Sequence, residues 1–199
     1  DGVDLVTGAI RPQTQEYTIA RQIAGDFPDI PFPDGWKANL LGVDLNLQYP
    51  AGWLMAREIK FSQGYTRPAP RDYVGRSPLS QRESRALARY TEQVDPELVL
   101  AYHTQGKAIY WQFRDYAVPG AKELGEEFAR LSGYSLEETP YESSFAGYKD
   151  WFIQDFRRPG FTIEAGSGTN PLPLSKFDEI YRDNLGILVT AATGLPEKN

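Results

Sequence analysis

The stretch ELVLAYHTQG, residues 97–106, contains the strand signal on which the predicted fold depends. Its apolar run is short and nearly continuous, a pattern typical of a β-strand that is buried on both faces. The run ends at His103, the only histidine in the sequence, and polar residues and a glycine follow at once. A histidine at a strand end has the position of a metal ligand or a catalytic base, yet this sequence offers no second histidine to act with it.

Helical and strand patterns alternate on both sides of this run. A second apolar run, RPGFTIEAG at 158–166, predicts another buried strand that ends at Glu164 and is followed by glycine. Strands that alternate with helices predict an α/β domain of three layers, in which a mixed, largely parallel central sheet is flanked by helices. Helices are expected over residues 77–95, 119–134, 146–156 and 174–194, the first of them with a capping-box spacing between Ser80 and Glu83.

The N-terminal part of the sequence has a different character. Residues 1–42 are rich in Gly, Pro and Asp, which favours loops, turns and short extended pieces over helices. The segment LLGVDLNLQYP, residues 40–50, contains a short strand signal, and we expect Asp44 and Asn46 at the end of that strand. Ligands of α/β sheets gather at the carboxyl ends of strands, so Asn46, His103 and Glu164 are expected on one rim.

Composition narrows the class of protein. The 199 residues are 41% hydrophobic and carry a net charge of −6, so we expect one folded domain over residues 1–199. The acidic balance disfavours nucleic-acid binding, and no apolar run approaches the roughly 20 residues of a membrane span. The absence of cysteine excludes disulfides and thiol ligands, and it is compatible with several cellular compartments.

Each candidate residue also has a purely structural interpretation. His103 is compatible with a structural or surface histidine, and Glu164 with a buried ion pair instead of a general base with a raised pKa. Asn46 and its neighbours are also typical of a simple turn, because Asp and Asn bind nearby backbone groups. The aromatic residues around Lys149 fit the apolar face of a helix, and a lysine in such a helix is usually solvated.

These residues match two kinds of hydrolase only in part. A Ser-His-Asp hydrolase needs only one histidine, but the Gly-x-Ser-x-Gly pattern of one large class is absent, because GSGTNP at 166–171 has a different spacing. A zinc hydrolase commonly takes two histidines and a carboxylate, and one histidine cannot complete that set.

Taken together and in order, several blocks of the sequence resemble the carboxypeptidase A-like zinc peptidases. Within that family, they resemble the γ-D-glutamyl-L-diamino-acid peptidases that cut bacterial cell-wall peptides. The resemblance covers nearly the whole sequence. The blocks are DGVDLVTGAI, WKANLLGVDLNLQYPAGW, REIKFSQGYTRPAPRDYVG, DPELVLAYHTQGKAIYW, SGYSLEETP, FAGYKDWFIQDFRRPGFTIEAG and NPLPLSKFDEIYRDN.

The resemblance implies roles for the two strand-end residues. Members bind one catalytic zinc ion through a His-x-x-Glu pair and a later histidine at a strand end, which His103 matches. Glu164 matches the general base that activates water and then protonates the leaving amine. The His-x-x-Glu pair precedes the part of the family pattern that this sequence matches. We therefore expect residues 1–199 to be the C-terminal portion of a catalytic domain, with the remaining zinc ligands on an N-terminal segment outside it.

Further roles follow from the resemblance, with one departure. Lys37 in WKAN matches the basic residue that stabilises the oxyanion, and Tyr141 is the nearest match to a tyrosine that closes over substrate. Asn46 matches the asparagine that binds the substrate carboxylate. Carboxypeptidases have arginine after that asparagine, whereas this sequence has Leu47, which argues against ordinary carboxypeptidase activity. Lys149 occupies the specificity position, where we expect it to pair with an acidic group of the substrate.

The sequence thus predicts a zinc peptidase that cleaves γ-D-glutamyl-diamino-acid bonds of peptidoglycan peptides and is inactive as this isolated chain. The alternatives are a non-catalytic binder of cell-wall peptides and an ordinary zinc carboxypeptidase. The expected partners are peptidoglycan-derived peptides and the N-terminal segment of the same domain, without nucleic acid or a membrane span. Such substrates favour the bacterial cell envelope or the exterior over the cytoplasm.

Overall fold

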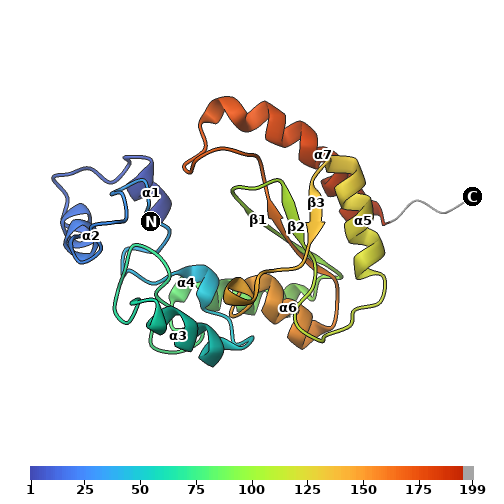
Figure 1. Cartoon of the computed structure of the whole chain (residues 1–199), viewed down its shortest axis with the longest axis horizontal. Coiled ribbons are helices and arrows are strands. Elements are labelled where there is room, and N and C mark those ends of the chain that lie inside the picture. Colours follow the sequence, from blue (N-terminus) through green and yellow to red (C-terminus); the bar gives the residue numbers. More distant parts are fainter. Residues whose placement is uncertain (195–199) are drawn as a thin grey trace, which may run out of the picture. The chain divides into compact units, whose positions relative to one another are not determined.

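The computed structural model describes residues 1–194 and divides into two compact units. The first unit comprises Asp1–Asp95 and Tyr141–Tyr148, and the second comprises Pro96–Pro140 and Lys149–Asn199, described up to residue 194. Figure 1 identifies the elements of both units by label and colour. The expectation of a single domain over residues 1–199 stays a prediction.

The second unit is built on a four-stranded mixed sheet. Its strands are β1 (Val99–His103), β2 (Ala108–Tyr110), β3 (Ser135–Glu137) and β4 (Gly160–Glu164), in the order β1-β4-β2-β3. The pairs β1–β4 and β2–β3 are parallel, whereas β2 runs antiparallel to β4. The predicted mixed sheet, with its two longest strands ending at His103 and Glu164, is confirmed.

One detail of the strand prediction was wrong. β1 lies at the edge of this sheet in the described part of the chain, where only β4 pairs with it. Tyr102 is 42% exposed, so the face of β1 that carries it is not buried. A run of apolar residues shows that a strand is largely apolar but cannot show whether another layer covers each of its faces.

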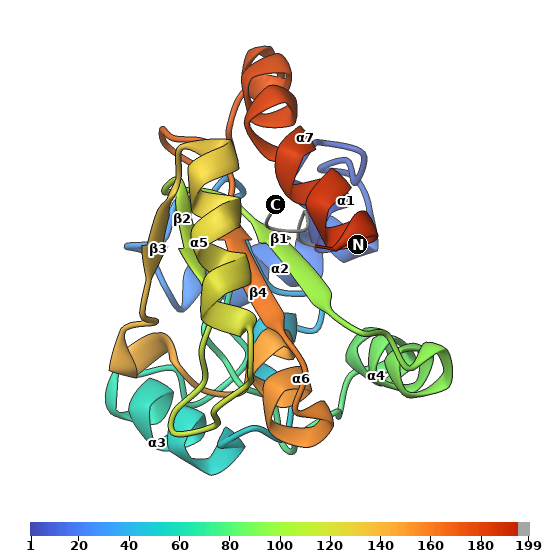
Figure 2. The same ribbon diagram turned by 90° about the vertical axis from the view of Figure 1, so that its right-hand side faces the viewer.

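Helices cover this sheet as predicted. α5 (Ala121–Ser132) packs against β2 and β3 and against α7 (Phe177–Thr193), and Figure 2 shows α5 crossing in front of the sheet. α5 ends at Gly133, whose φ of +73° is favourable for glycine. α6 (Tyr148–Phe156) precedes β4, and a short 3₁₀ turn, η3 (Leu174–Lys176), leads into α7. The core between sheet and helices is formed by Ile109, Phe128, Phe161, Ile163 and Ile187.

The first unit is more helical than the sequence predicted. Its elements are α1 (Gly2–Val6), α2 (Gln15–Gly25), η1 (Leu45–Leu47), α3 (Trp53–Ser62), α4 (Arg82–Val94) and η2 (Tyr141–Ser143). The expectation of loops over residues 1–42 was wrong, because α2 begins after Thr14, whose hydroxyl accepts a hydrogen bond from the Tyr17 amide. Ala20 and Ala24 then bury the inner face of α2 beside Trp36.

Two local predictions for the first unit were also wrong. The segment 40–50 forms the 3₁₀ turn η1 instead of a strand, because the Asp44 carboxylate accepts the Asn46 amide and closes a turn. The capping box is not formed, since α4 begins after Gln81 and the Ser80 hydroxyl donates to the side chain of Gln48 instead. The helix itself is confirmed at Arg82–Val94.

Candidate functional site

His103 and Glu164 lie side by side at the ends of two neighbouring strands. They are register partners in the parallel pair β1–β4, so both side chains extend from the same face of the sheet at the carboxyl ends of these strands. The distance from Nδ1 of His103 to Oε1 of Glu164 is 4.0 Å, and the side chains are 31% and 21% exposed. The pair is thus reachable by a ligand while being partly screened from water.

Backbone hydrogen bonds hold the chain just beyond these two residues. The Ala165 amide donates to the His103 carbonyl at 2.8 Å, and the Gly106 and Lys107 amides donate to the Gly166 carbonyl at 2.9 and 3.1 Å. The loop after β1 and the loop after β4 are therefore tied to each other. This arrangement limits how far His103 and Glu164 can separate.

In the first unit, Asp44 organises the turn that presents Asn46. Its carboxylate accepts the Asn46 amide at 3.2 Å and the Asp72 amide at 3.0 Å. Burial raises the pKa of Asp44, an effect opposed by these backbone hydrogen bonds and by the charge of Lys37. The Asn46 side chain is left exposed on the turn.

Asp72 connects this turn to two basic residues. Lys60 and Arg71 each approach its carboxylate at 2.7 Å. Burial acts to raise the pKa of Asp72, but the hydrogen bonds from Lys60 and Arg71 outweigh it and leave that pKa below its usual value. Asp72 is therefore held as an anion beside the Asn46 turn.

Lys37 and Tyr141 are both exposed in the first unit. The Lys37 backbone is fixed by a hydrogen bond from its amide to the Pro70 carbonyl at 2.8 Å, while its side chain faces solvent. Tyr141 is 64% exposed, and its ring meets Phe145 edge to face at 5.1 Å between centroids. Asn46, Lys37 and Tyr141 belong to one unit and His103 and Glu164 to the other, so their common rim stays a prediction.

Lys149, the predicted specificity residue, lies in a buried ion pair, and its role toward the substrate stays a prediction. Its side chain is only 5% exposed, and its ammonium group lies 2.6 Å from the Asp150 carboxylate. The same group donates to the Gln112 carbonyl, also at 2.6 Å. These contacts give Lys149 a part in the folded structure, because removing one partner of a buried ion pair is costly.

The described side chains at this position can supply one ligand of a metal ion but do not form a complete metal site. Within residues 1–194, no group of three or more His, Cys, Asp or Glu side chains is placed to hold a metal. His103 provides one partly exposed imidazole with Glu164 beside it, an arrangement suited to one nitrogen ligand next to an acid–base group. Zinc bound here needs further ligands.

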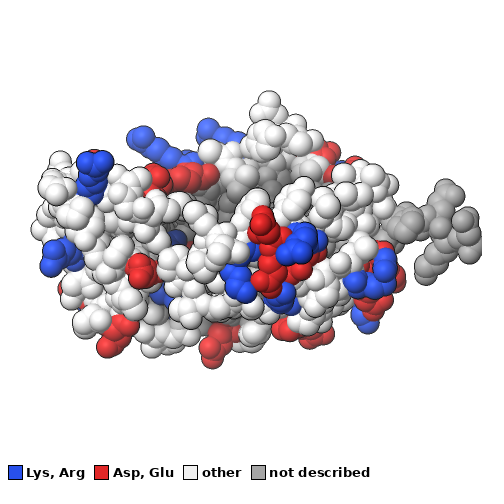
Figure 3. All heavy atoms as spheres, turned by 90° about the horizontal axis from the view of Figure 1, so that it is seen from above, with Lys and Arg blue, Asp and Glu red and all other residues white. Residues whose placement is uncertain are grey.

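Figure 3 shows how charged side chains are distributed over one face of the molecule. On the face drawn in Figure 3, the coloured Lys and Arg side chains are interspersed with Asp and Glu, without a broad basic area. In the described part of the chain, no helix has the length and apolar composition needed to cross a membrane.

Comparisons with known proteins agree with this fold. The family model described as zinc carboxypeptidase matches residues 20–186. A γ-D-glutamyl-L-diamino acid endopeptidase of Lysinibacillus sphaericus is 49% identical over 189 residues, which are 95% of this chain and 46% of that protein. The protein YqgT of Bacillus subtilis is 38% identical over 188 residues, which are 94% of this chain and 48% of that protein. The chain spans about half the length of these curated relatives.

Solved structures share the fold at low sequence identity. The murein-tripeptide amidase MpaA of Escherichia coli O157 matches with a TM-score of 0.55 and 22% identity, over 83% of this chain and 66% of that one. Bovine thrombin-activatable fibrinolysis inhibitor matches with a TM-score of 0.58 and 16% identity, over 76% of this chain and 56% of that one. The family match and the fold agree on a domain of the α/β class. The chain belongs to the zinc carboxypeptidase family.

Proposed function

We propose that this chain is part of a zinc-dependent peptidase that hydrolyses γ-D-glutamyl-diamino-acid bonds in bacterial cell-wall peptides. The observation that carries the proposal is the His103–Glu164 pair at the ends of β1 and β4, in a member of the zinc carboxypeptidase family. The substrate class follows from the relative that is 49% identical, whose name states that bond.

In this proposal His103 is one protein ligand of a single zinc ion. When bound, zinc polarises the scissile carbonyl and lowers the pKa of water. Because peptidase zinc sites commonly use three protein ligands, and residues 1–194 place only one histidine and one carboxylate together, the other ligands come from outside this sequence. The 199 residues alone are then inactive.

Glu164 is proposed as the acid–base residue. Its carboxylate takes a proton from the attacking water and passes it to the nitrogen of the leaving amine. The side chain is 21% exposed, so water and a peptide can reach it, while the partly apolar strand end limits competing solvation.

Three residues of the first unit are proposed to contact the substrate. Lys37 stabilises the negative charge that develops on the carbonyl oxygen, Asn46 binds a substrate carboxylate, and Tyr141 closes over the peptide. Their exposure supports these roles. Leu47, in the place of the carboxypeptidase arginine, is 9% exposed and provides no cation for a free C-terminal carboxylate, which favours the γ-D-glutamyl substrate.

The proposed substrate also suggests a location. Peptidoglycan peptides are the expected partners, so an enzyme that cuts them in the intact wall acts in the cell envelope or outside the cell. Peptides released from the wall are a second source of the same bond, and activity on both kinds of substrate distinguishes the two.

The test uses the natural polypeptide that carries these residues, supplied with zinc and a muropeptide containing a γ-D-glutamyl-diamino-acid bond. Glu164→Gln is expected to lower kcat by roughly 10²–10⁴-fold, because the amide cannot transfer the proton. Zinc content should stay at that of the unmodified protein. Glu126→Gln is the matched control, because Glu126 is an exposed glutamate on α5 and its change should leave kcat unaltered.

Two results would contradict the proposal. Retention of full activity in Glu164→Gln removes the acid–base role. Saturable muropeptide binding without zinc and without cleavage identifies a non-catalytic wall-peptide binder, and release of C-terminal amino acids from ordinary peptides identifies a carboxypeptidase.

A further inference from the structure

A buried hydroxyl group lies behind the strand ends that carry His103 and Glu164. Tyr134 is 4% exposed and directly follows the glycine that ends α5. Its oxygen accepts hydrogen bonds from the Gly166 amide at 3.1 Å and from the side-chain amide of Asn184 at 3.0 Å. Tyr134 thus connects α5, α7 and the residue that lies two positions after Glu164.

Gly166 transmits this connection to the loop after His103. While its amide donates to Tyr134, its carbonyl accepts the amides of Gly106 and Lys107. Gly166 has a φ of +74°, and a Cβ atom there would lie 2.8 Å from the Ile180 side chain, so only glycine suits the position. One residue therefore holds both loops at a fixed separation.

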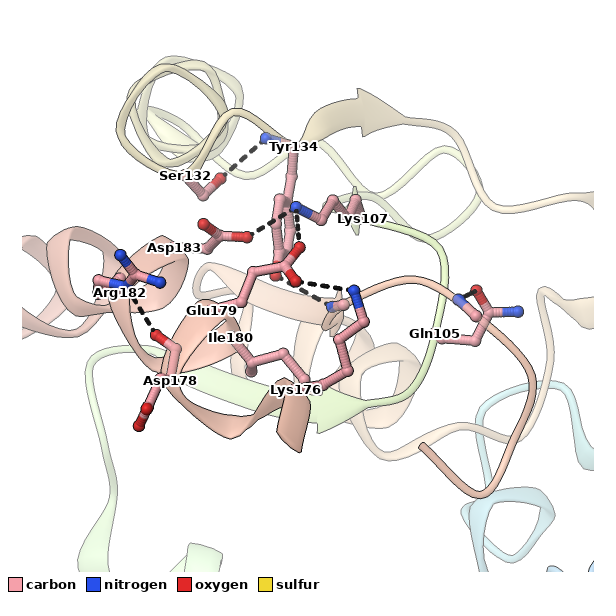
Figure 4. A network of polar contacts seen from close by, with 12 residues as sticks. Gln105, Lys107, Ser132, Tyr134, Lys176, Asp178, Glu179, Ile180, Arg182 and Asp183 are labelled. Atoms are coloured by element: carbon pink, nitrogen blue, oxygen red, sulfur yellow. Dashed lines mark hydrogen bonds and ion pairs between the residues drawn. The ribbon is translucent and has the colours of Figure 1, made fainter. Parts of the chain in front are cut away.

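Lys107 forms a second attachment of the same loop to α7. Its ammonium group donates to the Asp183 carboxylate at 2.9 Å and lies 3.0 Å from Glu179, as Figure 4 shows. The same group lies 5.7 Å from the centre of the Tyr134 ring. Lys176 pairs with the other oxygen of Glu179 at 2.9 Å. The loop after His103 is thus held by a buried hydrogen bond through Gly166 and by partly exposed ion pairs.

We propose that Tyr134 and Lys107 are positioning residues, which hold the Gly166 junction so that His103 and Glu164 keep their separation. This inference rests on the proposed function of that pair. Acid–base and ligand groups lose rate steeply when displaced, because a misplacement of about 1 Å costs roughly 100-fold. Neither Tyr134 nor Lys107 is proposed to touch the substrate.

Tyr134→Phe is the direct test, because it removes one oxygen atom and keeps the ring. In the intact protein, amide hydrogen exchange of Gly166 and Gly106 should become roughly 10-fold faster, since a buried donor has lost its acceptor. Exchange of Ile163 in β4 and of Phe128 in α5 should be unchanged, which separates a local loosening from general destabilisation. The kcat on the muropeptide should fall roughly 10-fold, with KM unchanged.

Tyr181→Phe is the matched control, because Tyr181 lies on α7 and is 50% exposed. It should alter neither exchange nor kcat. Lys107→Met keeps the apolar stem and removes the ion pairs at a partly exposed position, so it provides the test if Tyr134→Phe does not fold. It should also speed exchange at Gly106 and lower kcat, by a smaller factor than Tyr134→Phe.

The outcomes separate this inference from the proposed function. Unchanged exchange at Gly166 and Gly106 in Tyr134→Phe overturns the inference, whether or not the protein is active. Faster exchange with full kcat overturns the positioning role. If the unmodified protein, loaded with zinc, does not cleave the muropeptide, the proposed function fails, and the positioning role that rests on it is overturned as well.

Discussion

At the scale of single residues, burial decides which charged side chains a ligand can reach. Lys37 is exposed, whereas Lys149 is 5% exposed and already holds two partners. Both lysines were assigned to the site from their positions in the sequence, and sequence alone does not distinguish them. The distinction is thermodynamic, because a buried paired charge is part of the folded structure.

The structural role of Lys149 leads to a prediction about stability. Lys149→Met removes one partner of a buried ion pair, which should lower the free energy of unfolding by about 3–5 kcal/mol. Lys122→Met, at an exposed lysine whose Nζ lies 3.9 Å from Glu126, should cost only about 0–1 kcal/mol. Denaturant unfolding of the chain measures both changes.

Measurements of substrate selectivity test whether Lys149 binds substrate instead. If Lys149→Met folds with unchanged stability but loses preference for peptides with a diaminopimelate carboxylate, the lysine binds substrate and its structural role is wrong. An unchanged ratio of kcat/KM between peptides with and without that carboxylate agrees with the buried pair.

Residue patterns predicted His103 and Glu164 but missed Tyr134. An apolar run that ends in a polar residue is a local signal, and both strand ends show it. Tyr134 follows a helix-ending glycine and has no distinctive neighbours in sequence. Its partners are 32 and 50 residues away, so its role appears only once the chain is folded.

At the scale of elements, α7 stabilises the loop between β1 and β2 through charge. Hydrogen bonds from Lys176 and Lys107 lower the pKa of Glu179 to about 2. Hydrogen bonds to Asp183 and Glu179 raise the pKa of Lys107 to about 12. The contribution of Lys107 to stability is therefore complete below its unfolded pKa of roughly 10.4 and is lost as pH rises through about 12.

The Glu179 carboxylate gives the corresponding prediction at low pH. Its folded pKa lies below the unfolded value of roughly 4.3, so its stabilising effect is present above that value and is lost as pH falls through about 2. The unfolding free energy of the unmodified chain should exceed that of Glu179→Gln at pH 6, and the difference should shrink toward pH 2. Denaturant unfolding at both pH values measures this.

Salt provides the control for this prediction. Glu179 is partly exposed, so 1 M NaCl should weaken its contribution at pH 6 by screening the two lysines. A difference between the two proteins that is the same at pH 6 and pH 2 contradicts the assigned pairing.

The elements themselves were predicted unevenly. The helices α4 to α7 and the strands β1 and β4 have long or strongly patterned sequences, and all were expected. α2 was missed because Gly and Pro residues surround its apolar positions, and η1 because LLGVDLN resembles a strand until the Asp44 carboxylate closes the turn. In both cases a side-chain cap decided the backbone conformation.

At the scale of the whole molecule, the affinity for zinc tests the proposed ligand role of His103. Residues 1–194 provide no group of three metal-ligating side chains, so the 199-residue chain should bind zinc weakly. The natural polypeptide that carries it should bind one equivalent tightly. Competition with a zinc chelator measures both affinities, and His103→Ala should weaken binding in each.

Two outcomes would contradict this prediction. Tight stoichiometric binding by the 199-residue chain means that it contains a complete zinc site. If His103→Ala leaves the zinc affinity of the natural polypeptide unchanged, this histidine is not a ligand. Chelation should abolish muropeptide cleavage, and added zinc should restore it.

By itself the sequence determined the α/β class, the longest helices and the two strands that end in His103 and Glu164, because these are expressed as local patterns of apolar and polar residues. The tertiary structure alone decided that those two side chains come within 4.0 Å, that Lys149 is buried in an ion pair, and that Tyr134 joins the loops behind the strand ends. These facts depend on register, burial and hydrogen bonds between residues far apart in the chain, and only packing creates them.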